Sequence, residues 1–121
     1  MLKFKVKGIK FAQAFVIGKH FKLKQAQKVG VKKAGEFYKK EVKESIKGNR
    51  AEKRSVDTGE FLNSVDLVQD DDSVMIFSDV KQAKPLEFGT SRIPARKHFS
   101  NSEHRNKKEI QNIIESEVRQ I

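Results

Sequence analysis

One stripe of small and apolar residues runs through the middle of the chain and requires a long helix. Its members recur every three or four positions: Leu23, Ala26, Gly30, Ala34, Phe37, Tyr38, Val42 and Ile46. This spacing places them on one face, so we expect an amphipathic helix of about six turns that ends near Gly48. Because an apolar face of this length has to be buried, the rest of the chain must supply the elements that cover it.

Two glycines lie inside this predicted helix. Gly30 and Gly35 each lower the local helix propensity by about 1 kcal/mol relative to alanine. We expect that they permit close packing against a sheet or another helix. The lysines of the segment lie mostly off the apolar stripe, at Lys24, Lys28, Lys32, Lys39, Lys40, Lys43 and Lys47.

Strands are predicted at the start of the chain and after its midpoint. Leu2, Phe4 and Val6 alternate with lysines, which indicates a half-buried strand. "SVDLV" and "VMIFSD" flank the acidic turn "QDDDS", so residues 64–79 are expected to form a hairpin. A short helix over residues 9–18 is expected to close near Gly18, and residues 49–57 are expected to form an exposed, mobile loop.

The remaining segments predict short turns and a terminal helix. Asp57 or Thr58 is expected to cap a short turn that points Phe61 and Leu62 inward. A second short turn is expected near residues 83–88, within a loop over 80–99. Ser100 and Glu103 fit a capping box at the start of a final helix. The apolar stripe of that helix is Ile110, Ile113, Ile114, Val118 and Ile121.

This order of elements predicts one α+β domain spanning residues 1–121. A small antiparallel sheet is covered by a long helix from the N-terminal half and by a C-terminal helix. The chain has no cysteine, which excludes a disulfide framework. Its longest apolar run, "FAQAFVIG", is too short to span a bilayer, and the basic start is not followed by a secretion-type signal.

Charge is distributed unevenly along the chain, whose formal net charge is +10. Residues 1–54 carry 17 Lys or Arg against 4 Asp or Glu, whereas residues 55–121 carry 9 against 12. The basic half suits nucleic acid, an acidic protein surface or the acidic half of another copy. Lysine far exceeds arginine there, which favours nonspecific contact over base-specific readout. A solvated lysine-rich face explains the same composition.

No motif for catalysis, a metal or a cofactor emerges from the residues. His20, His98 and His104 lack a metal-ligand spacing, and His98 is interpreted as a loop contact. Asp57, Glu60, Asp79 and Glu87 are the acids available for carboxylate chemistry. The "EVK" at 41–43 matches a nuclease element superficially, but it lies in a predicted helix rather than on a strand. We therefore expect a protein that is not an enzyme and has no cofactor.

The run "LEFGTSRIPARKHF" at 86–99 follows "DTGEFLNSV" at 57–65, and a terminal amphipathic helix follows both. In this order and spacing the three pieces resemble the neck and minor tail-component family of long-tailed bacteriophages, the head–tail joining proteins. The resemblance covers roughly residues 20–121. The matching positions are Thr58, Gly59, Ser64, Glu87, Phe88, Gly89, Thr90 and Phe99.

The resemblance implies that the matching residues form an assembly or interface motif. Gly89 is expected to allow a bend that a Cβ would oppose, and Phe88 to anchor this bend in the core. Glu87 is expected to hold a basic group or backbone donors. Pro94 and Ala95 are expected to shape a loop that reaches another subunit. A turn inside a monomeric domain explains the same residues.

Three functional hypotheses follow from the sequence. The first is a structural virion protein, a ring-forming connector in the neck or tail, made in the bacterial cytoplasm. Its partners would be further copies of itself, other neck or tail proteins and, nonspecifically, DNA in the channel, but no membrane. The second is a lysine-rich nonspecific nucleic-acid-binding protein, and the third a small nuclease. Contact with DNA or an acidic partner is assigned to Lys32, Lys39, Lys40 and Lys43.

Overall fold

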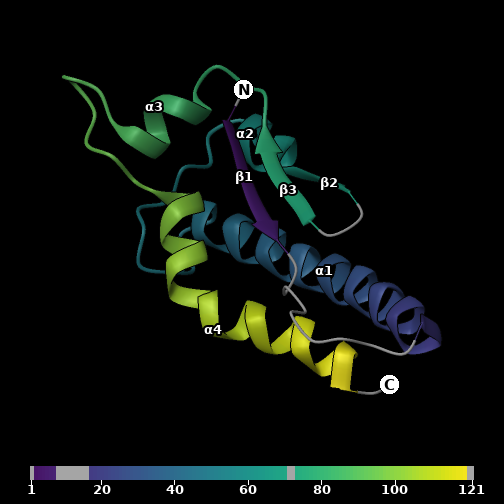
Figure 1. Cartoon of the computed structure of the whole chain (residues 1–121). Helices are drawn as coiled ribbons and strands as arrows, with labels where there is room; N and C mark the ends of the chain where they lie inside the picture. The colour runs from purple at the N-terminus through teal and green to yellow at the C-terminus, as the bar shows by residue number, and fades with distance from the viewer. Residues whose placement is uncertain (1, 8–16, 71–72, 120–121) are drawn as a thin grey trace.

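The structure is a computed structural model of the chain, and it describes residues 2–7, 17–70 and 73–119. Seven elements follow one another in the order β1 (Leu2–Lys7), α1 (Ile17–Ile46), α2 (Glu60–Ser64), β2 (Asp66–Gln69), β3 (Ser73–Ser78), α3 (Ala83–Phe88) and α4 (His98–Arg119). Figure 1 shows α1 and α4 lying together beside a small sheet, with α3 and its loop extending away from the body. The α+β class predicted from the sequence is confirmed.

The three strands form one antiparallel sheet in the order β1-β3-β2. The hairpin expected over residues 64–79 is therefore confirmed, although its turn at 71–72 lies outside the described residues. The pairs Phe4–Ile76 and Leu67–Ile76 put one apolar side chain from each strand on the same face of the sheet. That inner face packs against α1, whose buried residues include Ala34, Tyr38 and Val42.

The long helix is confirmed but begins earlier than the stripe indicates. α1 starts at Ile17, so Gly18 does not end a separate helix but lies in the first turn of α1. Residues 9–16 of the expected short helix lie outside the described residues. At the other end, Gly48 adopts a positive φ of 87°, and its amide donates to the carbonyl of Ser45. This left-handed glycine ends the helix as expected.

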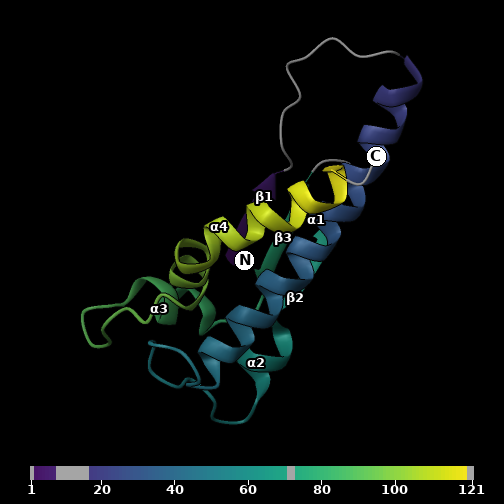
Figure 2. The same ribbon diagram turned by 90° about the horizontal axis from the view of Figure 1, so that it is seen from below.

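Both glycines of α1 lie where another element approaches the helix backbone. A Cβ on Gly30 would come within 3.0 Å of the Ile114 backbone in α4. A Cβ on Gly35 would come within 2.6 Å of Cγ2 and 2.8 Å of Cγ1 of Val74 in β3. One glycine thus admits the second helix and the other admits the sheet, which confirms the expected close packing. In Figure 2 the two long helices run side by side.

The terminal helix has the predicted apolar stripe but a different start. Ile110 and Ile114 are buried, and Ile113 and Val118 are half-buried, whereas Ile121 lies outside the described residues. α4 begins at His98, so Ser100 is its third residue and not its cap. The capping box predicted for Ser100 and Glu103 is therefore wrong, because another acid already occupies the amides of the first turn.

We predict that Gly35→Ala destabilises the protein although alanine favours a helix. The propensity gain of about 1 kcal/mol is opposed by overpacking against the buried, β-branched Val74, at a typical cost of about 1–3 kcal/mol. Urea unfolding followed by circular dichroism should show a lower midpoint. In a Val74→Ala background the same change should become neutral or stabilising, because the clashing methyl groups are gone. An identical effect in both backgrounds would contradict the close approach.

Candidate functional site

The segment 83–97, which we call the arm, joins the sheet to α4. It consists of α3 and the loop that follows it, and Figure 1 shows it extending beyond the rest of the molecule. The short turn predicted at 83–88 is confirmed as a helix. The amide of Arg96 donates to the carbonyl of Leu86 over 2.7 Å, so the end of the loop is hydrogen-bonded to α3.

Glu87 fixes the base of the arm to α4. Its side chain is 1% exposed, and its carboxylate accepts the backbone amides of Phe99 and Ser100 over 2.8 and 3.0 Å. The Ser100 hydroxyl donates to the same carboxylate over 2.6 Å. Glu87 is thus the cap of α4, supplied from a different element. Of the two alternatives expected for this residue, the structure has the backbone donors.

Gly89 makes the sharp bend after α3. Its φ of 79° and ψ of 169° lie in a region that is essentially restricted to glycine. A Cβ there would also come within 2.8 Å of the Ala95 amide nitrogen and 3.1 Å of the Ile93 carbonyl oxygen. The expectation that a Cβ would oppose this bend is therefore confirmed, for both conformational and steric reasons.

Thr90 organises the outer half of the arm. Its hydroxyl accepts the amides of Arg92 and Ile93 over 3.2 and 3.1 Å. Its own amide donates to the carbonyl of Ile93 over 2.8 Å. The loop tip consequently has a defined backbone conformation, while Pro94 and Ala95 remain exposed beside it.

Phe88 points out of the protein, which corrects the expected core anchor. Its side chain is 63% exposed, and Ile93 across the loop is 37% exposed. The two neighbours Glu87 and Phe88 lie about 100° apart around the axis of α3, so both cannot face the core. The acid takes the inner position because α4 offers it three donors, and the aromatic ring is left outside.

The other motif of the resemblance, at residues 57–65, lies at the base of the arm. Gly59, with a φ of 88°, precedes α2, and the Thr58 hydroxyl accepts the Glu60 amide over 3.3 Å. Ser64 donates to the Phe61 carbonyl over 2.7 Å and bonds to Ser78 over 2.6 Å. Phe61 is buried and Leu62 half-buried, as expected. A cavity of about 330 Å³ is lined by residues 54–61 together with Gln82, Leu86 and Arg96, so the two motifs share one hollow.

Phe99 belongs to the core of the protomer. It is fully buried, and its ring stacks on Phe4 of β1 with centroids 5.4 Å apart. Its carbonyl accepts the Tyr38 hydroxyl over 2.9 Å. Burial raises the pKa of Tyr38 far above its usual value, so this phenol stays a neutral donor. Among the matching positions, Glu87 and Phe99 therefore hold the arm and Phe88 is presented by it.

His98 is a buried helix residue, which corrects its interpretation as a loop contact. It is 0% exposed, its Nδ1 lies 2.7 Å from the Ser45 hydroxyl, and its Nε2 lies 2.7 Å from the Ser55 hydroxyl. Burial is the main reason that its pKa falls to about 4. Ser45 donates onward to Glu52, so neutral His98 donates from Nδ1 to Ser45 and accepts from Ser55.

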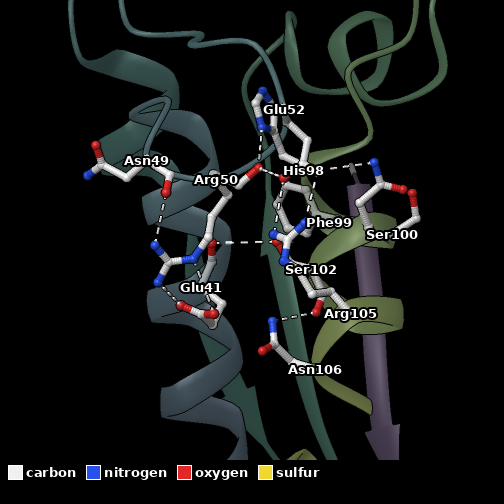
Figure 3. Close-up of polar contacts among 12 residues, drawn as sticks. Glu41, Asn49, Arg50, Glu52, His98, Phe99, Ser100, Ser102, Arg105 and Asn106 are labelled. Atoms are coloured by element: carbon white, nitrogen blue, oxygen red, sulfur yellow. Dashed lines mark hydrogen bonds and ion pairs between the residues drawn. The ribbon is translucent and has the colours of Figure 1, made fainter.

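Glu52 links the loop after α1 to α4, as Figure 3 shows. Arg105 donates to both of its oxygens over 3.0 and 3.1 Å, and Asn101 donates over 3.2 Å. Burial would raise the pKa of Glu52, but the bonds from Arg105, Ser45 and Asn101 outweigh it and hold the pKa at about 2. The predicted loop over 49–57 is exposed except for the buried Glu52 and the half-buried Ser55 and Val56. Composition gave no signal for this acid.

The four lysines assigned to a DNA or acidic partner lie on α1. Lys32 and Lys40 are exposed, and Lys39 and Lys43 are half-buried. Lys39 is within 3.3 Å of Asp66 in β2. A shallow groove lined by Lys39, Lys40, Lys43, Lys47, Glu36, Glu44 and Leu67 runs here, so two acids interrupt its positive charge.

Within residues 2–7, 17–70 and 73–119, no group of three or more His, Cys, Asp or Glu residues is placed to hold a metal ion. Of the acids considered for carboxylate chemistry, Glu87 is committed to α4, whereas Asp57 and Glu60 both line the cavity beside the arm. In the described part of the chain no helix is long and apolar enough to cross a membrane.

Neither protein-family models nor curated proteins nor solved structures gave a match to the chain.

We predict that Glu87→Ala lowers the free energy of unfolding by about 1–3 kcal/mol, because it leaves the buried Phe99 amide without its acceptor. Urea unfolding measures this loss. Glu87→Gln keeps one acceptor oxygen and should lose less. Glu109→Ala, at an exposed position of the same helix, is the control and should stay within about 0.5 kcal/mol of wild type. A loss no larger than the control's would contradict the capping role.

We also predict that mild acid destabilises the protein through His98. The folded pKa is about 4 and the unfolded pKa about 6.5, so the unfolded state binds more protons below pH 6.5. Stability is lost as the pH falls through this value, by roughly 2 kcal/mol at pH 5. Urea unfolding at pH 7.5 and pH 5 tests this.

His98→Gln, which cannot titrate, is the control for this prediction and should lose clearly less between the two pH values. Glu52 does not contribute in this window. Its pKa is lowered from 4.5 to about 2, so its stabilisation disappears only as the pH falls through that lower range. Equal losses for wild type and variant would assign the pH dependence to other groups.

Proposed function

We propose that the protein is a structural virion component of a long-tailed phage or prophage, a ring-forming connector of the neck or tail. The observation that carries the proposal is the rigid presentation of Phe88. A buried acid and a glycine at positive φ set the shape of the arm, and the residue between them is 63% exposed. Fixed exposure of an aromatic side chain suits a contact with another protein.

The family resemblance supports the same proposal from the sequence side. The two motifs that carry the resemblance, at residues 57–65 and 86–99, form the arm and its attachment. The mechanism would be assembly rather than catalysis: copies join side by side around the channel, and the ring seals or extends it. The protein would then act in the virion, with further neck or tail proteins as partners.

The lysines of α1 supply a second contact in this proposal. Lys32, Lys39, Lys40 and Lys43 lie off the buried stripe of the helix, where they can meet channel DNA or an acidic partner ring. Contact through lysines neutralises phosphates without reading bases. Binding of this kind would be nonspecific, and Glu36 and Glu44 in the same groove would weaken it.

We predict that the purified protein forms oligomers whose mass rises with concentration and then stops at a fixed multiple of 13.9 kDa, as expected for a closed ring. Light scattering and negative-stain electron microscopy measure the mass and reveal rings. Gly89→Val should keep most of the helical circular dichroism but fail to assemble, because the bend that aims the arm is lost.

Ser91→Ala is the matched control within the same loop and should assemble like wild type. Complementation of a phage lacking the gene extends the comparison to particles. A protein that stays monomeric alone and with candidate neck partners would refute the connector. Normal assembly of Gly89→Val would show that the bend at Gly89 is not needed for assembly.

A further inference from the structure

The arm presents an apolar tip surrounded by positive charge. Phe88 and Ile93 are exposed, and the exposed charged residues around them are Lys84, Arg92 and Lys97. The single acid within residues 83–97 is Glu87, which is buried against α4. The arm therefore offers an apolar anchor with cations and no exposed anion, which suits an apolar surface bordered by acids.

Such a surface lies on the outer face of the sheet, on the side away from α1. Val68 pairs with Met75, and Asp66 with Phe77. Their neighbours Leu67, Val74 and Ile76 point to the inner face, so Val68, Met75 and Phe77 share the outer one. Val68 is 54% exposed, and Met75 and Phe77 are half-buried. We call these three residues the outer patch.

Acids border the outer patch along one edge of the sheet. Asp66 is the first residue of β2 and Asp70 comes directly after its last, so the two acids lie on either side of Val68 in sequence, and both are exposed. Lys39 reaches Asp66 from α1, but the Asp66 side chain remains 63% exposed. On the far side of the sheet, β1 carries the exposed Lys3 and Lys5 on this same face. A cationic partner is therefore favoured over β2 and disfavoured over β1.

The arm and the outer patch lie on different parts of one protomer. Figures 1 and 2 both show α3 and its loop at one end of the molecule, with β2 on the other side of the sheet. One protomer can therefore use its arm on one neighbour and its patch on another. A contact between two different surfaces repeats, and it gives a closed ring when the rotation closes.

We infer that the arm of one copy docks on the outer patch of the next copy, with Phe88 and Ile93 against Val68, Met75 and Phe77. Lys84 and Arg92 then lie near Asp66 and Asp70 of that copy. This inference rests on the proposed self-assembly and adds the surfaces and their head-to-tail order. The partner is a second copy of this chain because one chain carries both complementary surfaces.

Two single variants disable the two sides separately. Phe88→Glu removes the anchor and places a negative charge opposite the acids, whereas Val68→Lys places a positive charge opposite the arm. Both residues are exposed in the protomer, so urea midpoints should stay near wild type. Each variant alone should weaken self-association by at least about tenfold, as loss of an interface anchor does. Val29→Lys, at a 44% exposed position of α1, is the matched control and should assemble normally.

Mixing the two variants is the decisive step. The intact arm of Val68→Lys can dock on the intact patch of Phe88→Glu, but the resulting pair has no second working contact. Light scattering should therefore show a species of twice the 13.9 kDa protomer mass that does not grow further. A mixture that stays monomeric, or variants that assemble like Val29→Lys, would overturn the docking assignment while leaving the connector proposal standing.

The remaining outcomes separate the inference from the proposal beneath it. If wild type and Val29→Lys are both monomeric at every concentration, self-assembly itself fails and the contact fails with it. If Phe88→Glu loses binding to DNA or to another neck protein but keeps wild-type self-association, the arm serves that other partner and the inference is overturned.

Discussion

The hydrogen bonds of one buried carboxylate determine how the arm is attached to the rest of the protein. Glu87 accepts the first amides of α4 and the Ser100 hydroxyl, and it does so from the last turn of α3. Because the acceptor and the donors belong to different elements, capping the helix also fixes the angle between the arm and the body. Gly89 then turns the chain two residues after Glu87, so the hydrogen bonds of Glu87 also determine the position of the exposed loop tip.

A second set of hydrogen bonds, separate from those of Glu87, also holds the start of α4. Glu52, Ser45, His98 and Ser55 form a continuous series of hydrogen bonds between α1, the loop after it and α4. Hydrogen bonds are directional, so in a small domain such a series makes the packing of the elements more specific than apolar side chains alone would. Phe99, the residue after His98, donates its amide to Glu87 and stacks its ring on Phe4. The first two residues of α4 therefore tie the helices, the loop and the sheet together.

The sequence predicted those features that periodicity and glycine encode. The stripe of α1, the alternation of β1 and the hairpin all follow from side chains that must face one core. Gly35 and Gly89 could be assigned because only a missing Cβ tolerates their surroundings. The start of α4 could not, since Ser100 and Glu103 satisfy a local capping rule and the acid that displaces them is eleven residues before the helix. For the same reason Phe88 was expected inside: hydrophobicity favours burial of the ring, and the donors that draw Glu87 inward are invisible until α4 is placed. His98 and Glu52 were missed because their partners are distant in sequence and carry no spacing signal.

The thirty residues of α1 extend over about 45 Å, and its described side chains are packed only along part of that length. Between residues 24 and 29 none is buried, whereas burial starts at Gly30, where α4 approaches, and continues to Ile46. Packing on α1 is therefore uneven, because α4 and the sheet hold residues 30–46 and bury none of residues 24–29. Free energies of local opening should rise along the helix from residues 24–29 to its centre. A force applied at residues 24–29 would consequently be transmitted to the packed part of α1 near Gly30, where the two helices touch.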